Sequence, residues 1–76
     1  MRTMAKIDCY DYFILPGVIQ IAVRGTNDPI LVDILSEVER ANGRIYVEGH
    51  HFMMQGYDIH RNGEQTYLDL QVITID

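Results

Sequence analysis

The stretch HFMMQGYDIHRNGEQTYLDLQVITI, residues 51–75, decides the fold, because it holds two runs of strand-forming residues separated by Asn62-Gly63. An Asn-Gly pair between two such runs is the strongest short-range signal for a β-hairpin and is typical of a type I′ turn. We therefore expect a two-residue turn at Asn62 and Gly63. This turn places Arg61 opposite Glu64 and sets the pairing of every residue further along the hairpin.

Side chains on a strand alternate between the two faces of its sheet, so this register sorts the hairpin by side. One face is predicted to be the core, covered by a helix: Met53, Gln55, Tyr57 and Ile59 with Thr66, Leu68, Leu70 and Val72. The other face is predicted to be open: Phe52, Met54, Asp58 and His60 with Gln65, Tyr67, Asp69, Gln71, Ile73 and Ile75. The open face is polar near the turn and apolar at its far end.

An earlier pair of strands is predicted on either side of Pro16-Gly17, which suits the centre of a type II turn because Gly17 can take a positive φ. This turn places Tyr12 opposite Ile21 and Ile14 opposite Ile19. One side of the first hairpin is then continuously apolar, as expected of a sheet face that covers a core.

The segment between the two hairpins carries the pattern of an amphipathic helix over residues 29–42. Apolar side chains recur there at three- and four-residue spacing: Ile30, Leu31, Ile34, Leu35, Val38 and Ala41. Asp28 is expected to be the N-cap, Pro29 the first helical residue and Gly43 the left-handed residue after the helix. A short strand, RIYVE at residues 44–48, follows and turns at Gly49-His50 into the long hairpin.

These elements predict an α+β fold of order ββαβββ, with one helix packed in a second layer on a mostly antiparallel sheet. The 76 residues are expected to form one domain, residues 1–76, with a loose leader at residues 1–4. A core this small rarely supplies more than about 3–5 kcal/mol, and with Cys9 as the only cysteine no disulfide can reinforce it. Oligomerisation is therefore one expected source of further stability.

Composition limits the classes of function. The formal net charge of −5 argues against a general nucleic-acid binder, which needs a basic surface. The first apolar run is too short to span a bilayer, and the lone cysteine suits a reducing, cytoplasmic setting. No cofactor and no membrane association are expected. Small acidic domains of this kind resemble regulators or inhibitors, including those of phages and mobile elements, by analogy of size and charge alone.

The apolar end of the open face is the main functional hypothesis. Large exposed apolar patches usually mark interaction surfaces, so we expect a non-enzymatic module that forms a homodimer or docks on a larger protein. The predicted interface residues are Phe52, Met54, Tyr67, Ile73 and Ile75, joined by Ile45 and Val47 of the short strand. The alternative is a curled, barrel-like sheet that buries both of its ends on itself.

Two further functions stay open. Asp58, His60 and Asp69 share a face, and one histidine with two carboxylates can bind a divalent metal ion, so the histidine-rich strand is a candidate metal or small-molecule site. The second is an acidic decoy of nucleic acid that presents Asp33, Glu37, Glu39, Asp58 and Asp69. No nucleophile with a base beside it is readable, and an enzyme is not expected.

Overall fold

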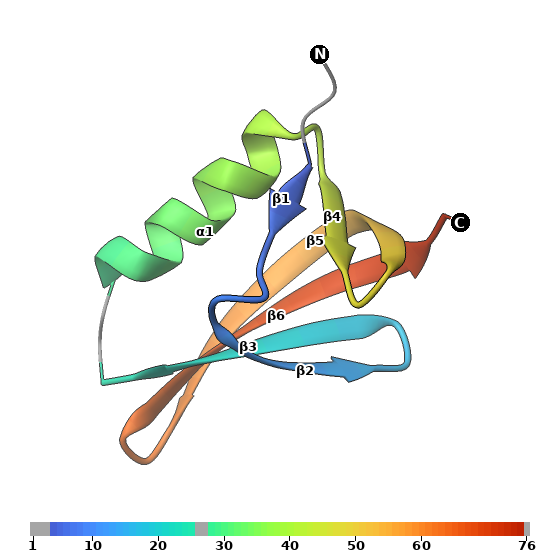
Figure 1. Ribbon diagram of the computed structural model, residues 1–76. Helices are drawn as coiled ribbons and strands as arrows, with labels where there is room; N and C mark the ends of the chain where they lie inside the picture. Colours follow the sequence, from blue (N-terminus) through green and yellow to red (C-terminus); the bar gives the residue numbers. More distant parts are fainter. Residues whose placement is uncertain (1–3, 26–27, 76) are drawn as a thin grey trace.

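A computed structural model describes residues 4–25 and 28–75, which form one helix and six strands (Figure 1). The elements, in chain order, are β1 (Ala5–Lys6), β2 (Asp11–Leu15), β3 (Val18–Arg24), α1 (Asp28–Arg40), β4 (Arg44–Val47), β5 (His50–Asn62) and β6 (Gln65–Thr74). The predicted order of two strands, a helix and three strands is confirmed, and β1 is a short addition to it. Residues 1–3 of the predicted leader and the side chain of Asp28 lie outside the described part.

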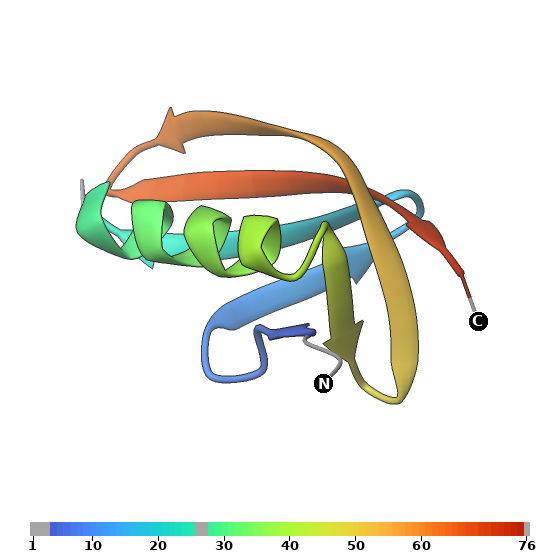
Figure 2. The same ribbon diagram turned by 90° about the horizontal axis from the view of Figure 1, so that it is seen from above.

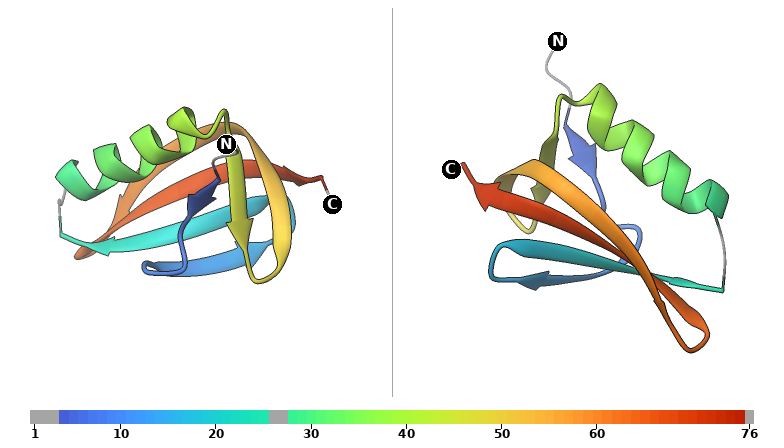
Figure 3. Two further views of the ribbon diagram at one scale, coloured as in Figure 1. Left: turned by 45° about the horizontal axis from the view of Figure 1, so that its top comes forward. Right: turned by 180° about the vertical axis from the view of Figure 1, so that it is seen from behind.

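All six strands belong to one curved sheet in the order β1-β4-β5-β6-β3-β2. The β1–β4 pair is parallel and every other pair is antiparallel, so the prediction of a mostly antiparallel sheet is confirmed. The helix lies on the concave side of the sheet, as Figures 2 and 3 show. We call the opposite side the convex face.

The core fills the space between the helix and the concave side. Every strand except β2 contributes buried apolar side chains to it, and α1 contributes a single stripe. The buried members are Ala5, Ile7, Ile19, Ile21, Val23, Leu31, Ile34, Val38, Ala41, Ile45, Val47, Phe52, Leu68, Leu70 and Val72. The helical stripe is the one predicted from three- and four-residue spacing, with Ile30 and Leu35 at its half-buried margin.

The first hairpin has the predicted register. Tyr12 lies opposite Ile21 and Ile14 lies opposite Ile19, around a turn in which Gly17 has a φ of 76°. A positive φ at the second central residue is what a type II turn requires, and only glycine adopts it without strain.

The helix ends differently from the prediction. The N–H of Gly43 donates to the carbonyl of Val38 at 2.9 Å, and the N–H of Asn42 donates to the carbonyl of Glu39 at 3.0 Å. This pair of bonds is a Schellman motif, in which Asn42, with a φ of 57°, is the left-handed residue after the helix. The predicted assignment of that position to Gly43 is wrong by one residue.

The turn predicted at Asn62-Gly63 lies one residue further along the chain. Asn62 pairs with Gln65, so the turn residues are Gly63 and Glu64, and only Gly63, with a φ of 66°, is left-handed. That combination is typical of type II′, which places glycine first. Arg61 consequently lies opposite Thr66 in place of Glu64. The change moves each partner by two residues, an even number, so side chains near the turn keep their predicted faces.

A β-bulge in β5 reverses the faces predicted for the residues in the first half of this strand. Gly56 pairs with Gln71, but Met54 pairs with Val72, so Gln55 is an extra residue without a partner on β6. One extra residue reverses the alternation from that point on. Phe52 and Met54 therefore face the core, whereas Met53 lies opposite Ile73 on the convex face.

The curvature of the sheet brings its two ends towards each other. The Tyr12 hydroxyl on edge strand β2 donates a 2.8 Å hydrogen bond to the Glu48 carboxylate, in the turn between β4 and β5. Ile45, Val47 and Phe52 are at most 7% exposed inside this curve. The barrel-like alternative thus describes β4 and the start of β5 better than the open-face prediction did.

Candidate interaction surface

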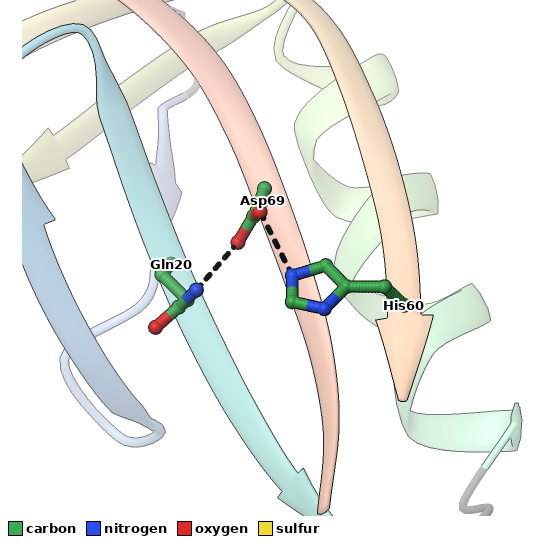
Figure 4. A network of polar contacts seen from close by, with 3 residues as sticks. All are labelled: Gln20, His60 and Asp69. Atoms are coloured by element: carbon green, nitrogen blue, oxygen red, sulfur yellow. Dashed lines mark hydrogen bonds and ion pairs between the residues drawn. The ribbon is translucent and has the colours of Figure 1, made fainter. Parts of the chain in front are cut away.

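The polar half of the convex face is built from three adjacent strands. Asp69 on β6 accepts a hydrogen bond from the Gln20 side-chain amide on β3 at 3.0 Å (Figure 4). Its other carboxylate oxygen lies 3.0 Å from Nε2 of His60 on β5. The His60 ring also stacks on Tyr67, with 5.3 Å between ring centroids. These contacts hold the side chains of β3, β6 and β5 in one ordered row.

Asp58 lies directly opposite Asp69 across the β5–β6 pair, on the same face as His60. The predicted trio of Asp58, His60 and Asp69 is thus brought together as neighbours. Within residues 4–25 and 28–75, however, no three histidine, cysteine, aspartate or glutamate side chains are arranged to hold a metal ion. In this arrangement Asp69 contacts Gln20 and His60, whereas Asp58 lies across the strand pair from it.

The convex face also exposes four large apolar side chains, on edge strand β2 and at the end of β6. Phe13 and Leu15 alternate with the core-facing Tyr12 and Ile14, so they lie on the convex side of β2. Ile73 and Ile75 occupy the end of β6 and the residues just after it, where the N–H of Ile75 donates to the carbonyl of His51. These four side chains are each between 47% and 54% exposed, and we call them the convex patch.

The convex patch retains part of the predicted interface. Ile73 and Ile75 are exposed as expected, and Tyr67 is half-buried on the same face beside His60. Met54 is half-buried and packs against the core. Ile45, Val47 and Phe52 are core residues, so the surface expected from them does not exist in this fold. The bulge explains the change at all four residues, because Ile45 pairs with Phe52 and the two β4 side chains therefore share the face of Phe52 and Met54.

Phe13 and Leu15 were not among the predicted interface residues. The segment DYFIL, residues 11–15, carried the signal, because apolar residues there occupy both alternating positions. Such a strand is apolar on both faces, whereas the sheet has only one helix to cover it. The exposure of one of its faces was therefore readable from the sequence.

The histidines before the bulge point into different surroundings. His51 packs against Tyr46, with 4.7 Å between the ring centroids, and lines a small hollow with Met4, Arg44 and Ile75. His50 lines a separate apolar hollow of about 470 Å³, whose other walls are Ile14, Leu15, Pro16, Gly17, Phe52, Val72 and Thr74. The two adjacent histidines thus do not act on one ligand, as their alternation on a strand predicts.

Two tyrosines of the edge segment have raised pKa values. For Tyr12 the main cause is the hydrogen bond that its hydroxyl donates to Glu48, because ionisation of the phenol would lose that bond. For Tyr10 the main cause is burial, followed by the neighbouring Cys9 thiol. Both phenols are therefore protonated, and act as donors, at neutral pH.

A comparison with known protein families, with characterised proteins and with solved structures finds no match to this chain. No helix among the described residues is long and apolar enough to cross a membrane.

Proposed function

We propose that this protein is a small non-enzymatic interaction module that docks on a protein partner through the convex patch. The observation that carries the proposal is the exposure of Phe13, Leu15, Ile73 and Ile75 on one face of the sheet. Several large apolar side chains exposed on one face of a small protein are typical of a binding site for another macromolecule.

The energetic scale supports this assignment. Complete burial of one large apolar side chain contributes about 1.5–3 kcal/mol. A domain of this size has a total stability of only about 3–5 kcal/mol. Covering the convex patch therefore contributes a free energy comparable to that of folding, before the cost of association is subtracted.

The polar half of the same face supports recognition over catalysis. Gln20, His60 and Asp69 bond one another, and Tyr67 stacks on the ring of His60. A network whose members satisfy one another gives a surface a fixed shape and a fixed set of charges. Ordered polar groups together with exposed apolar side chains are a usual combination in protein–protein interfaces.

The test is affinity capture, from the source cells, by wild-type chain and by a Phe13→Asp/Ile73→Asp variant. We expect a partner that is retained by the wild type at high ionic strength and lost by the variant. Val32→Asp is the matched control, because Val32 is 59% exposed on the helix, away from the convex face. Circular dichroism of each variant verifies that the fold is intact.

Two results would overturn the proposal. If the double variant retains the same partners as the wild type, the convex patch is not the docking surface. If binding survives in the variant but is abolished by added salt, the acidic-decoy alternative is favoured, since long-range charge attraction is screened by salt.

A further inference from the structure

Strand β5 extends well beyond the neighbour on its outer side. β4 pairs only with residues 50–53 of β5, whereas β6 pairs with β5 as far as Asn62. From Gly56 to Asn62 the strand therefore pairs on one side only among residues 4–25 and 28–75, and we call its other side the open edge. Figure 3 shows this part of β5 reaching past the end of β4 towards the hairpin turn.

This edge is accessible and has two charged side chains, Asp58 and Arg61, as its only protection of the usual kind. Every residue from Tyr57 to Asn62 is exposed, and the segment contains no proline and no lysine. Natural sheets blunt their edges with prolines, lysines, bulges or very short strands, because an open edge is a template for another strand. Here the bulge lies at Gln55, before the open part, and leaves the residues after it regular.

We propose that a second copy of this chain pairs with this edge, β5 against β5, in an antiparallel dimer centred on Ile59. In an antiparallel pair related by a two-fold axis, some residue must lie opposite its own copy. Ile59 is the middle residue of the open edge from Gly56 to Asn62, so this centre uses the whole edge. The two sheets then join into one continuous sheet.

The side chains complement one another in this register. Asp58 lies opposite His60 of the second copy, which sets a carboxylate beside an imidazole on the convex face. Tyr57 lies opposite Arg61 of the second copy on the concave side, where a guanidinium can stack on the phenol ring. The two-fold axis repeats both pairs, and cross-strand pairs of this kind each stabilise a sheet. The two Ile59 side chains meet at the axis.

Other registers of the β5–β5 pair are less favourable than the one centred on Ile59. Centring the pair on Asp58 places two carboxylates directly opposite each other, which is destabilising. Centring it on Tyr57 sets His60 opposite Met54, beyond the bulge at Gln55, where β5 is no longer regular. Centring it on His60 leaves Gly56 and Tyr57 without partners inside the open edge. Of these registers, the one centred on Ile59 gives every residue of the open edge a partner and sets Asp58 opposite His60.

This dimer goes beyond the proposed function, since it uses a different surface. The convex patch lies on β2 and at the end of β6, whereas the open edge belongs to β5 near the hairpin turn. Either surface can therefore fail its test without the other.

The first experiment is sedimentation equilibrium over a dilution series for wild type, Ile59→Lys and Val32→Lys. We expect the wild type to approach twice the chain mass of 8.8 kDa at high concentration and to dissociate on dilution. Ile59→Lys should stay at the chain mass throughout, because it opposes two ammonium groups at the axis. Val32→Lys, an equivalent change on the exposed side of the helix, should behave as the wild type.

A second experiment fixes the register and does not depend on the lysine variant. Oxidation of Ile59→Cys, in a Cys9→Ser background, should yield a disulfide-linked dimer, because residues directly opposite in an antiparallel pair lie within disulfide distance. Tyr57→Cys, two residues away on the same face, should stay monomeric under the same oxidant. A wild type that is monomeric at every concentration, a dimer undiminished by Ile59→Lys, or linking at residue 57 but not at 59 would overturn the proposal.

Discussion

Asp69 shows how one residue organises the convex face. It accepts from Gln20 and lies in contact with His60, although Asp58 occupies the position directly opposite it. Two like charges opposite each other destabilise a sheet, and the contacts from β3 and from His60 offset that cost. The Asp69 side chain therefore has mainly a structural role, and its neighbours give this part of the convex face its polar character.

The two faces of β6 predict a contrast between Leu70 and Ile73, which lie three positions apart on the strand. Leu70 is fully buried and Ile73 is 52% exposed. Leu70→Ala should lower the free energy of unfolding by about 2–5 kcal/mol, because it leaves a cavity in a small core. Ile73→Ala should change it by less than about 0.5 kcal/mol, as for other surface substitutions. Urea denaturation followed by circular dichroism measures both, and similar losses in the two variants would contradict the assigned faces.

At the scale of elements, single residues at turns and at the bulge control where whole strands point. Glu48 and Gly49 both have positive φ, so the β4–β5 turn is of type I′ and lies one residue earlier than the predicted Gly49-His50. The β5–β6 turn lies one residue later than predicted. Both hairpins formed as expected because their strands are strongly apolar and β-prone. Each turn lies one residue away from its predicted place, because glycine can occupy either of the two central residues of such a turn.

The end of the helix gives a prediction at this scale. Asn42 is the left-handed residue of the Schellman motif. Asn42→Ala should destabilise the protein by about 1–2 kcal/mol, because a Cβ without a local hydrogen-bonding group disfavours that conformation. Asn42→Gly should leave the stability unchanged or raise it, since glycine adopts a positive φ without strain. Equal melting temperatures for the alanine and glycine variants would contradict the motif.

The bulge gives a second prediction for an element. Deleting Gln55 removes the extra residue, so the alternation along β5 becomes continuous and Phe52 would face the convex side. Because Phe52 is only 7% exposed in the core, we expect the deletion to abolish cooperative thermal unfolding. Gln55→Ala keeps the bulge and is the control. A stable, cooperatively folded deletion variant would show that the bulge does not set the faces.

At the scale of the whole molecule, one side-chain hydrogen bond connects two distant parts of the sheet. The Tyr12–Glu48 hydrogen bond joins the edge strand β2 to the turn between β4 and β5, which are 36 positions apart in the chain. The bulge at Gln55 acts at the same end of the sheet, since it turns Phe52 and its β4 neighbours Ile45 and Val47 towards the core.

This contact predicts a dependence of stability on alkaline pH. The pKa of Tyr12 is raised in the folded protein, so the stabilisation is present below the ordinary tyrosine pKa of about 10 and is lost as pH rises through the raised value. The difference in unfolding free energy between wild type and Tyr12→Phe should therefore be constant near neutral pH and shrink above pH of about 10. Urea titrations at a series of pH values measure it. A difference that does not change with pH would contradict the hydrogen bond.

The sequence by itself determined the helix, the first hairpin, the class of fold and the burial of Leu68 and Leu70, because these follow from local periodicity and from strong turn residues. It also indicated the polar end of the open face, since alternation near the Asn62-Gly63 turn survives an even shift of register. The tertiary structure alone decided the bulge at Gln55, the curvature and the open edge of β5. Those depend on how strands of unequal length pack around one helix, and no local pattern encodes that packing.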